Sequence, residues 1–307
     1  MVFNGSGMII PPYLDQGDTI GIIAPARKVT REEVEPAITL LQEWGYRVRE
    51  GKNLYGAYRQ FSGRDDLRAS DLQECFDDPE VRAILCARGG YGSVRLIDRL
   101  DWRTLLRDPK WLIGYSDVTA LHSHIHQRLG MESLHAAMPL NFRDTGNETA
   151  LESLRMALQG TLRAYRVGPH ALNRDGVAEG PLVGGNLSVI YSLLGSPSSP
   201  DVAGKVLFLE DLEEYLYHVD RMMMNLRRNG WLDKIAGLIV GGMTGMNDNT
   251  VPYGQSAEEI IREAMEGTGV PLAFGFPAGH IPDNRALLLG RRVRLEVGRE
   301  VGLWFEG

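Results

Sequence analysis

The chain has 307 residues, of which 43% are hydrophobic, and its 33 basic and 40 acidic residues give a net charge of −7. This length suits two domains of ordinary size. No long run of one charge sign is present, which argues against nucleic acid or an anionic membrane as a partner. No apolar segment reaches the roughly 20 residues of a membrane-spanning helix, and the first residues lack the features of a secretory signal.

The two cysteines, Cys75 and Cys86, give no sign of a disulfide framework. Cys86 lies in an apolar run, which is typical of a small buried hydrophobic residue. Because a disulfide is improbable in a chain without an export signal, we expect a reducing, cytoplasmic location.

The first half of the chain alternates predicted strands and helices. A capping box of Thr30 and Glu33 opens the first helix, and Gly45 ends it. Strands are expected over 19–24, 46–50, 81–87 and 111–114, and helices over 31–44, 64–76 and 118–129. This alternation predicts an N-terminal α/β domain with a flavodoxin-like parallel sheet, whose ligand crevice lies at the carboxyl ends of the strands.

The periodicity weakens between residues 141 and 180, where we place the domain boundary. The prediction is an N-terminal domain over 1–150, a linker over 151–180 and a C-terminal domain over 181–307. Expected elements of the last part are helices at 187–194, 217–226 and 256–265, strands at 205–210 and 235–240, and short β-like pieces over 285–305. We therefore expect a mixed α/β domain with a β-rich, barrel-like core.

The stretch WLIGYSDVTA, residues 111–120, predicts an exposed serine. An apolar strand reaches Gly114, the chain turns through Tyr115 and Ser116, and a helical pattern begins behind Asp117. Such a turn projects the Ser116 hydroxyl above the end of the sheet, beside unpaired N–H groups that could stabilise an oxyanion. The alternative is that Ser116 only caps the helix.

A glycine-rich loop follows the strand 81–87, with the sequence Arg88-Gly89-Gly90-Tyr91-Gly92-Ser93. Its three glycines allow the backbone to approach a ligand closely, or simply to make a tight turn. The loop does not fit G-x-G-x-x-G, and G-x-x-x-x-G-K-[ST] is absent from the chain. Nucleotide binding therefore has no motif in its favour.

Seven histidines are candidate bases for a nucleophilic serine. His122, His124 and His126 resemble a metal cluster, but on a helix His124 faces away from the other two. No Cys or acidic partner completes the set, so no metal site is expected. His280 lies on a Gly/Pro-bounded loop after an apolar strand, where catalytic side chains are common, although a hydrogen bond to Asp283 would also explain it.

Glu210 ends an otherwise apolar strand. A half-buried carboxylate in this position needs a partner, because its burial otherwise costs free energy. Arg221 or Arg227 could supply that partner without any catalytic role.

Several short motifs, in this order, resemble the LD-carboxypeptidases, also called muramoyltetrapeptide carboxypeptidases, from about Thr19 to the C-terminus. They are Ala24-Pro25, the segment 64–78, Arg88-Gly89-Gly90-Tyr91-Gly92, Gly114-Tyr115-Ser116-Asp117, Gly184-Gly185-Asn186-Leu187, Leu209-Glu210-Asp211 with Tyr217 and Asp220-Arg221-Met222, and Gly279-His280. The family often has Pro-Ser-Ser after its first strand. Here Pro25-Ala26-Arg27 stands in its place, which leaves the local ligand contacts open.

The resemblance implies a Ser-His-Glu triad of Ser116, His280 and Glu210. It also implies an oxyanion hole made by the backbone N–H groups of Gly90 and Asp117, in agreement with the independent interpretation of both segments. No metal or organic cofactor is implied.

Four further residues are candidates for roles in the site. Glu213 and Glu214 are rivals for the acid of the triad, although Glu210 occupies the strand end that corresponds to the acid of the family. Tyr91 and Asn186 are candidate substrate contacts, with structural roles in turns as the alternative.

The resemblance implies hydrolysis of the L,D amide that releases the terminal D-alanine of murein tetrapeptides, in cytoplasmic peptidoglycan recycling. A homodimer is expected, because family members are commonly dimers. Met222-Met223-Met224 is adaptable apolar surface that could serve an interface or a core. One alternative is a related serine peptidase that detoxifies peptide–nucleotide antibiotics in self-immunity. The other is a non-catalytic protein that binds a small ligand, which would have no need of all three triad residues.

Overall fold

The first sheet is built from the short buried strands that the sequence predicts. In a computed structural model, which describes residues 2–3 and 7–306, five parallel strands lie in the order β4-β3-β5-β6-β7. They are β3 (Thr19–Ile23), β4 (Arg47–Glu50), β5 (Val81–Cys86), β6 (Trp111–Gly114) and β7 (Ser133–His135). This is the 2-1-3-4-5 order of flavodoxin-like folds.

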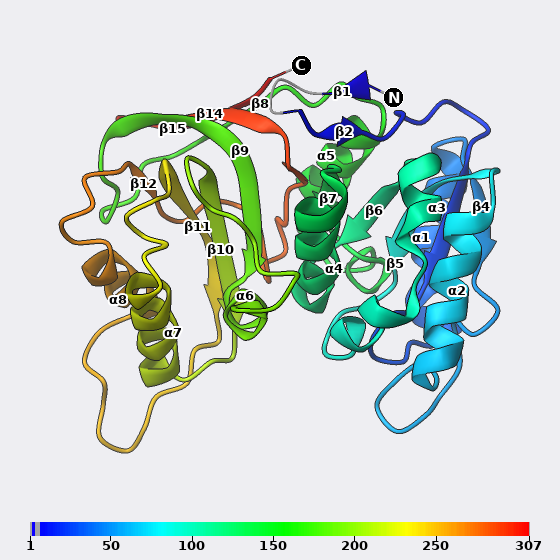
Figure 1. Cartoon of the computed structure of the whole chain (residues 1–307), viewed down its shortest axis with the longest axis horizontal. Coiled ribbons are helices and arrows are strands. Elements are labelled where there is room, and N and C mark those ends of the chain that lie inside the picture. The colour runs from blue at the N-terminus through cyan, green and yellow to red at the C-terminus, as the bar shows by residue number, and fades with distance from the viewer. Residues whose placement is uncertain (1, 4–6, 307) are drawn as a thin grey trace.

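Helices cover both faces of this sheet (Figure 1). Because side chains alternate along a strand, Ile22 packs with α1 and α5, whereas Ile23 packs with α2, α3 and α4. The capping box of Thr30 and Glu33 is present at the start of α1, as predicted. The helices are α1 (Arg31–Glu43), α2 (Asp65–Asp77), α3 (Trp102–Arg107), α4 (Thr119–His124) and α5 (Glu148–Leu158).

A strand from the end of the chain completes the first sheet. Strand β13 (Leu287–Leu289) pairs antiparallel with β7, and Leu287 lies opposite His135. The short β-like pieces near the C-terminus are confirmed, but their pairing with the N-terminal sheet is not visible in the sequence. The loop before β13 carries His280, so this pairing anchors that loop to the first sheet.

The second sheet has seven strands in the order β12-β11-β10-β9-β14-β15-β8. Its first four strands are parallel, and the pairs beyond β9 are antiparallel. The strands are β8 (Ala164–Val167), β9 (Gly176–Asn186), β10 (Val206–Leu212), β11 (Gly237–Thr244), β12 (Leu272–Ala273), β14 (Arg292–Val297) and β15 (Val301–Phe305). The segment 151–180 thus contains β8 and the start of β9, and the domain boundary stays a prediction.

The second sheet is open, which corrects the expectation of a barrel-like core. Its outermost described strands, β12 and β8, do not pair with each other. A single bridge between Arg174 and Leu272 links the segment after β8 to β12. Because the β14–β15 hairpin pairs with the far edge of β9, the antiparallel strands extend the sheet instead of closing it. The mixed α/β class itself is confirmed.

The two sheets share a hydrophobic core. One continuous cluster of buried side chains contains Ile20 and Ile22 of β3 together with Phe208 of β10 and Val293 of β14. The opposite face of the second sheet packs against α6 (Leu187–Leu193), α7 (Leu216–Arg228) and α8 (Ala257–Ala264). Close packing of this kind resists deformation, so residues on the two sheets keep a defined spacing.

Across the sheets, Arg291 Nε and Nη2 donate to the carboxylate of Glu132 at 2.7 and 2.8 Å, and both side chains are buried. This ion pair ties the segment before β14 to the segment before β7.

Met222 and Met223 belong to the core of the second sheet, whereas Met224 is exposed.

Both cysteines lie in the interior of the protein. Cys75 and Cys86 are free and buried, and burial raises the pKa of the Cys75 thiol to about 12.

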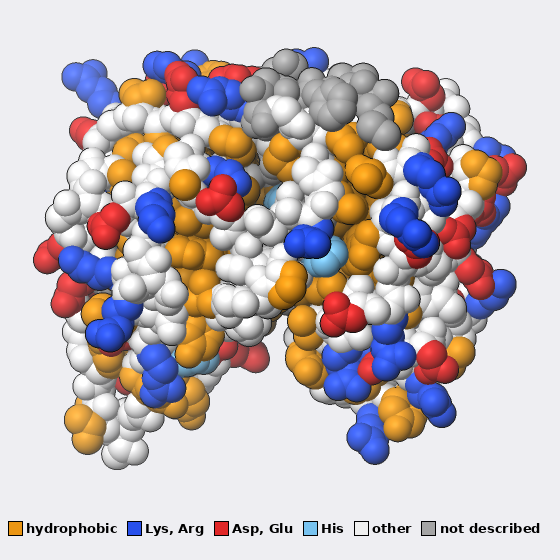
Figure 2. Space-filling view, in the orientation of Figure 1, with side chains coloured by type: hydrophobic (Ala, Val, Ile, Leu, Met, Phe, Trp, Pro, Cys, Tyr) orange, Lys and Arg blue, Asp and Glu red, His pale blue; other side chains and the backbone are white. Residues whose placement is uncertain are grey.

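Among the described residues, no helix is both long enough and apolar enough to cross a bilayer. Figure 2 shows basic and acidic side chains interspersed on one face of the molecule. The short ribbon of β1 (Val2–Phe3) and β2 (Ile9–Ile10) precedes β3.

Candidate active site

Ser116 lies at the corner between β6 and the helical turn that leads into α4. Its φ of +63° is in the left-handed region, which costs a non-glycine residue roughly 1–2 kcal/mol. Strain of this kind persists where the surrounding structure imposes it, often at functional sites. The capping alternative is not seen, because no side chain caps this turn and the Ser116 hydroxyl contacts His280 instead.

The structure brings the three predicted triad residues together. His280 Nε2 lies 3.0 Å from Ser116 Oγ, and His280 Nδ1 lies 2.6 Å from Glu210 Oε2. Glu210 is fully buried within β10, two residues before the strand ends, so its carboxylate is held where solvent cannot compete for the imidazole. The order hydroxyl, imidazole, carboxylate is the geometry that activates a serine as a nucleophile.

The rival residues do not hold the imidazole of His280. Glu214 contacts His218 at 2.5 Å, and Asp283 pairs with Arg285, so neither holds His280. Glu213 lines the same cavity as Ser116 but makes no hydrogen bond to the imidazole among the described contacts.

Two opposing effects set the pKa of His280. Burial disfavours the charged imidazolium and lowers the pKa, but the Glu210 carboxylate favours it, with smaller contributions from Asp211 and Glu213. The net effect raises the pKa of His280 above the ordinary value of 6.5. A positively charged imidazolium is therefore stabilised at this position.

The glycine loop after β5 lies against the serine corner. A Cβ atom on Gly89 would come within 2.8 Å of the Ser116 Cβ, so only glycine leaves room for the hydroxyl. The Asp117 carboxylate accepts a hydrogen bond from the Ser93 N–H at 2.8 Å and thereby ties the loop to the helical turn. The Gly90 N–H makes no hydrogen bond within the described part of the chain, and the Asp117 N–H lies in the first turn, where intrahelical acceptors are missing.

A cavity of about 430 Å³ opens above Ser116 and His280. Leu212 at the end of β10 lines it together with Glu213 and Glu214, which follow that strand. Tyr115 lines it after the end of β6, and Met138 and Leu140 line it after the end of β7. Arg27 and Arg88 complete the wall. Each arginine follows a buried parallel strand, and the carboxyl ends of such strands often form a ligand site. The sequence therefore indicates both arginines as candidates, although the sequence analysis assigns neither to the site.

The two candidate substrate contacts do not line this cavity. Tyr91 is 47% exposed, and its ring packs near Phe61. Asn186 is buried and caps α6, and its Nδ2 donates to Asp211 at 2.8 Å. Burial and the nearby Glu210 carboxylate raise the pKa of Asp211 to about 7. A contact of either residue with substrate stays a prediction.

The three clustered histidines are partnered separately. His122 Nε2 lies 2.8 Å from the Gly114 carbonyl oxygen, and the other two contact serine hydroxyls, His124 that of Ser198 and His126 that of Ser133. Burial lowers the pKa of His122 to about 4, so it is neutral near pH 7. Within the described residues, no group of three or more potential metal ligands is found.

Asn284 is a residue that sequence reasoning missed. Its side-chain oxygen accepts a hydrogen bond from the Gly279 N–H at 2.7 Å and lies 3.2 Å from His135 Nε2. Asn284 therefore links the loop of His280 to β7 of the first sheet. No local pattern could have revealed this role, because His135 and Asn284 lie far apart in the sequence.

Comparison with known proteins identifies the family. The LD-carboxypeptidase N-terminal domain matches residues 20–136, and the LD-carboxypeptidase C-terminal domain matches residues 179–295. The chain belongs to the LD-carboxypeptidase family. The first matched segment contains Ser116, and the second contains Glu210 and His280.

The relatives of this LD-carboxypeptidase family member include murein peptide carboxypeptidases and a self-immunity protein. It is 35% identical to the probable murein peptide carboxypeptidase of Bacillus subtilis, over 95% of this chain and 93% of the relative. The crystal structure of muramoyltetrapeptide carboxypeptidase from Oxalobacter formigenes is 27% identical, with a TM-score of 0.86, and covers 94% of this chain and 99% of that one. The microcin C7 self-immunity protein MccF of Escherichia coli is 26% identical, over 96% and 95% of the two chains.

Proposed function

We propose that this chain is a serine carboxypeptidase that hydrolyses the L,D amide of murein tetrapeptides and releases the terminal D-alanine, in peptidoglycan recycling. The observation that carries the proposal is the chain of contacts from Ser116 Oγ through His280 to Glu210, at 3.0 and 2.6 Å. Family membership and the murein carboxypeptidase relatives support the choice of substrate.

In the proposed reaction, Ser116 Oγ attacks the carbonyl carbon of the scissile amide while His280 Nε2 takes its proton. Glu210 orients the imidazole through Nδ1 and stabilises its positive charge. The N–H groups of Gly90 and Asp117 bind the oxyanion. His280 then gives the proton to the departing D-alanine nitrogen, and water hydrolyses the acyl-enzyme with His280 again as the base.

The test is release of D-alanine from a murein tetrapeptide by Ser116→Ala. We expect a loss of at least about 10³-fold in kcat with unchanged circular dichroism, since the variant keeps the fold but lacks the nucleophile. Ser192→Ala, an exposed serine on α6 that donates to the Val189 carbonyl oxygen, is the matched control and keeps wild-type turnover. Near-full activity of Ser116→Ala contradicts the proposal.

The self-immunity relative favours a second candidate function, hydrolysis of a peptide–nucleotide antibiotic. Stacking of a purine needs an open aromatic face in the site. The aromatic residue that lines the Ser116 cavity is Tyr115, and its ring already packs near His280 and His135, with centroids 4.8 and 5.6 Å away. This arrangement supports the murein substrate. Comparison of kcat/KM for a murein tetrapeptide and for an aminoacyl-nucleotide conjugate separates the two candidates.

A cytoplasmic location and a homodimer are also part of the proposal. The two free, buried cysteines agree with a reducing compartment. Light scattering coupled to size-exclusion chromatography measures the oligomeric state, and a monomeric mass contradicts the dimer.

A further inference from the structure

Two arginines lie at the ends of neighbouring strands of the first sheet. Arg27 follows β3 and Arg88 follows β5, and these two strands pair in parallel. In the 2-1-3-4-5 strand order, the gap between the first and third strands is the topological switch point, where ligands bind outside the carboxyl ends. Both arginines therefore project from the position at which this fold forms its crevice.

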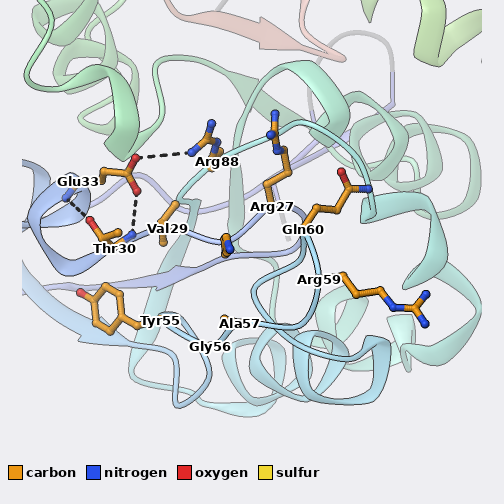
Figure 3. Close-up of a pocket in the computed structure, with 11 residues that line it drawn as sticks. Arg27, Val29, Thr30, Glu33, Tyr55, Gly56, Ala57, Arg59, Gln60 and Arg88 are labelled. Carbon is orange, nitrogen blue, oxygen red and sulfur yellow. Dashed lines mark hydrogen bonds and ion pairs between the residues drawn. The ribbon is translucent and has the colours of Figure 1, made fainter.

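Both side chains line two adjoining cavities. One is the cavity above Ser116, and the other is a larger one of about 760 Å³ that Figure 3 shows. In that view the guanidinium groups of Arg27 and Arg88 point in the same direction. The stem of Arg27 crosses Gly90 so closely that a Cβ atom on this glycine would overlap the Arg27 Cδ. Arg27 thus passes directly beside the candidate oxyanion N–H.

Both basic and acidic side chains line the cavity above Ser116. Arg88 has a loose ion pair with Glu33 at 3.6 Å. The Arg27 guanidinium makes no ion pair or hydrogen bond with any residue that the structure describes, although arginine stays charged at every physiological pH. Glu213 and Glu214, which directly follow β10, also line the cavity above Ser116. An anionic group of a bound ligand is therefore attracted to Arg27 and repelled by Glu213 and Glu214.

We propose that Arg27, assisted by Arg88, binds the free C-terminal carboxylate of the peptide substrate. This inference rests on the proposed carboxypeptidase function. In such a substrate the carboxylate belongs to the residue that follows the scissile carbonyl, so it lies within one residue length, about 3.8 Å between Cα atoms, of the reacting centre. A cation beside the oxyanion N–H of Gly90 meets that requirement, and a planar guanidinium can bind both carboxylate oxygens.

The proposal explains selection of chain ends. A peptide that continues beyond the scissile bond has no negative charge at this point and leaves Arg27 unpaired.

The experiment compares two substrates, a murein tetrapeptide ending in D-alanine and the same peptide ending in D-alaninamide. Wild type, Arg27→Gln, Arg27→Lys and Lys28→Gln are assayed for kcat/KM on both. Lys28 is the matched control, because it is exposed and lines only the larger of the two cavities. Its loss changes the net charge as much as the loss of Arg27 does.

We expect Arg27→Gln to lower kcat/KM for the free acid by about 10- to 100-fold, the loss that follows removal of a charged hydrogen bond. The amide suffers a much smaller loss, so the acid-to-amide ratio falls toward 1. Arg27→Lys recovers part of that ratio, and Lys28→Gln keeps the wild-type ratio. The amide substrate also reports whether each variant is folded.

Two results overturn the inference, and they can be told apart. If wild type hydrolyses both peptides and Arg27→Gln reduces them equally, the carboxylate lies elsewhere while the proposed function stands. If wild type hydrolyses neither peptide, the proposed function fails, and the inference fails with it.

Discussion

Gly279 lies directly against Glu210, and a Cβ atom on Gly279 would come within 2.7 Å of the Glu210 Cβ. The φ of Gly279 is +106°, a conformation that glycine adopts far more readily than other residues. The close approach lets the next residue, His280, place its Nδ1 against the Glu210 carboxylate. Glycine at this position is thus a condition for the contact between the imidazole and its acid.

We expect Gly279→Ala to lower kcat by about 100-fold, because a displacement of about 1 Å in a catalytic group has a cost of this size. The measurement is steady-state release of D-alanine. Gly267→Ala is the matched control, since Gly267 has a φ of +83° but open space around its Cα. Both variants lose stability through backbone strain, so equal activity losses would contradict the specific role of Gly279.

We expect the Glu210 carboxylate to govern the pH at which His280 can act as a base. The pKa of His280 lies above 6.5, and the imidazole must be neutral to accept the serine proton, so activity rises with pH through a midpoint above 6.5. Glu210→Gln removes the carboxylate that raises this pKa and leaves burial, which lowers it. We expect the acidic midpoint of the kcat/KM profile to move to lower pH, with kcat about 10³- to 10⁴-fold smaller.

Glu213→Gln is the control for this pH profile. Glu213 raises the pKa of His280 less than Glu210 does, so its removal moves the midpoint less than the Glu210 variant does. A midpoint that stays unchanged in Glu210→Gln would mean that another group controls the imidazole.

Asp117 links the glycine loop to the serine corner through its hydrogen bond from the Ser93 N–H. Asp117→Ala leaves this buried N–H without its acceptor, which costs about 1–3 kcal/mol. Urea unfolding measures that loss, and kcat falls as well, because the loop also carries Gly90. Asp117→Asn keeps an acceptor oxygen and should recover most of both quantities. An Ala variant as stable as wild type contradicts this account.

The ion pair of Arg291 with Glu132 is buried between the sheets. Arg291→Met removes the cation from a buried carboxylate, and we expect a loss of about 3–5 kcal/mol in the free energy of unfolding. The double variant Glu132→Leu/Arg291→Met removes both charges and should recover much of that loss. A double variant less stable than the single one would show that the charges themselves stabilise the fold.

Most of the first sheet could be predicted because its signals are local. Each buried strand is a short apolar run, and the Thr30 capping box marks the start of a helix within four residues. The pairing of β13 with β7 and the long strand β9 could not be predicted. Their residues meet through tertiary packing, and β9 contains Pro181 and five glycines or asparagines that disguise its β character.

Some features of the candidate site can be predicted from local sequence, and others depend on tertiary packing. Ser116 and the glycine loop are visible as strand-end motifs, and His280 and Glu210 were selected through the family resemblance. Their mutual distances depend on the shared core, which no spacing in the sequence encodes. The sequence motif also gives no hint of the left-handed φ of Ser116, since that conformation is imposed by neighbouring backbone.

The pairing of β13 with β7 has a consequence for the order of events during synthesis. The chain leaves the ribosome from its N-terminus, so β7 remains an open edge strand until Leu287–Leu289 emerge. Glu210 and His280 have emerged by then, and the closing of this edge brings the His280 loop to Ser116. We therefore expect chains that end before β13 to have no peptidase activity, so that hydrolysis begins only after Leu287–Leu289 have emerged and paired with β7.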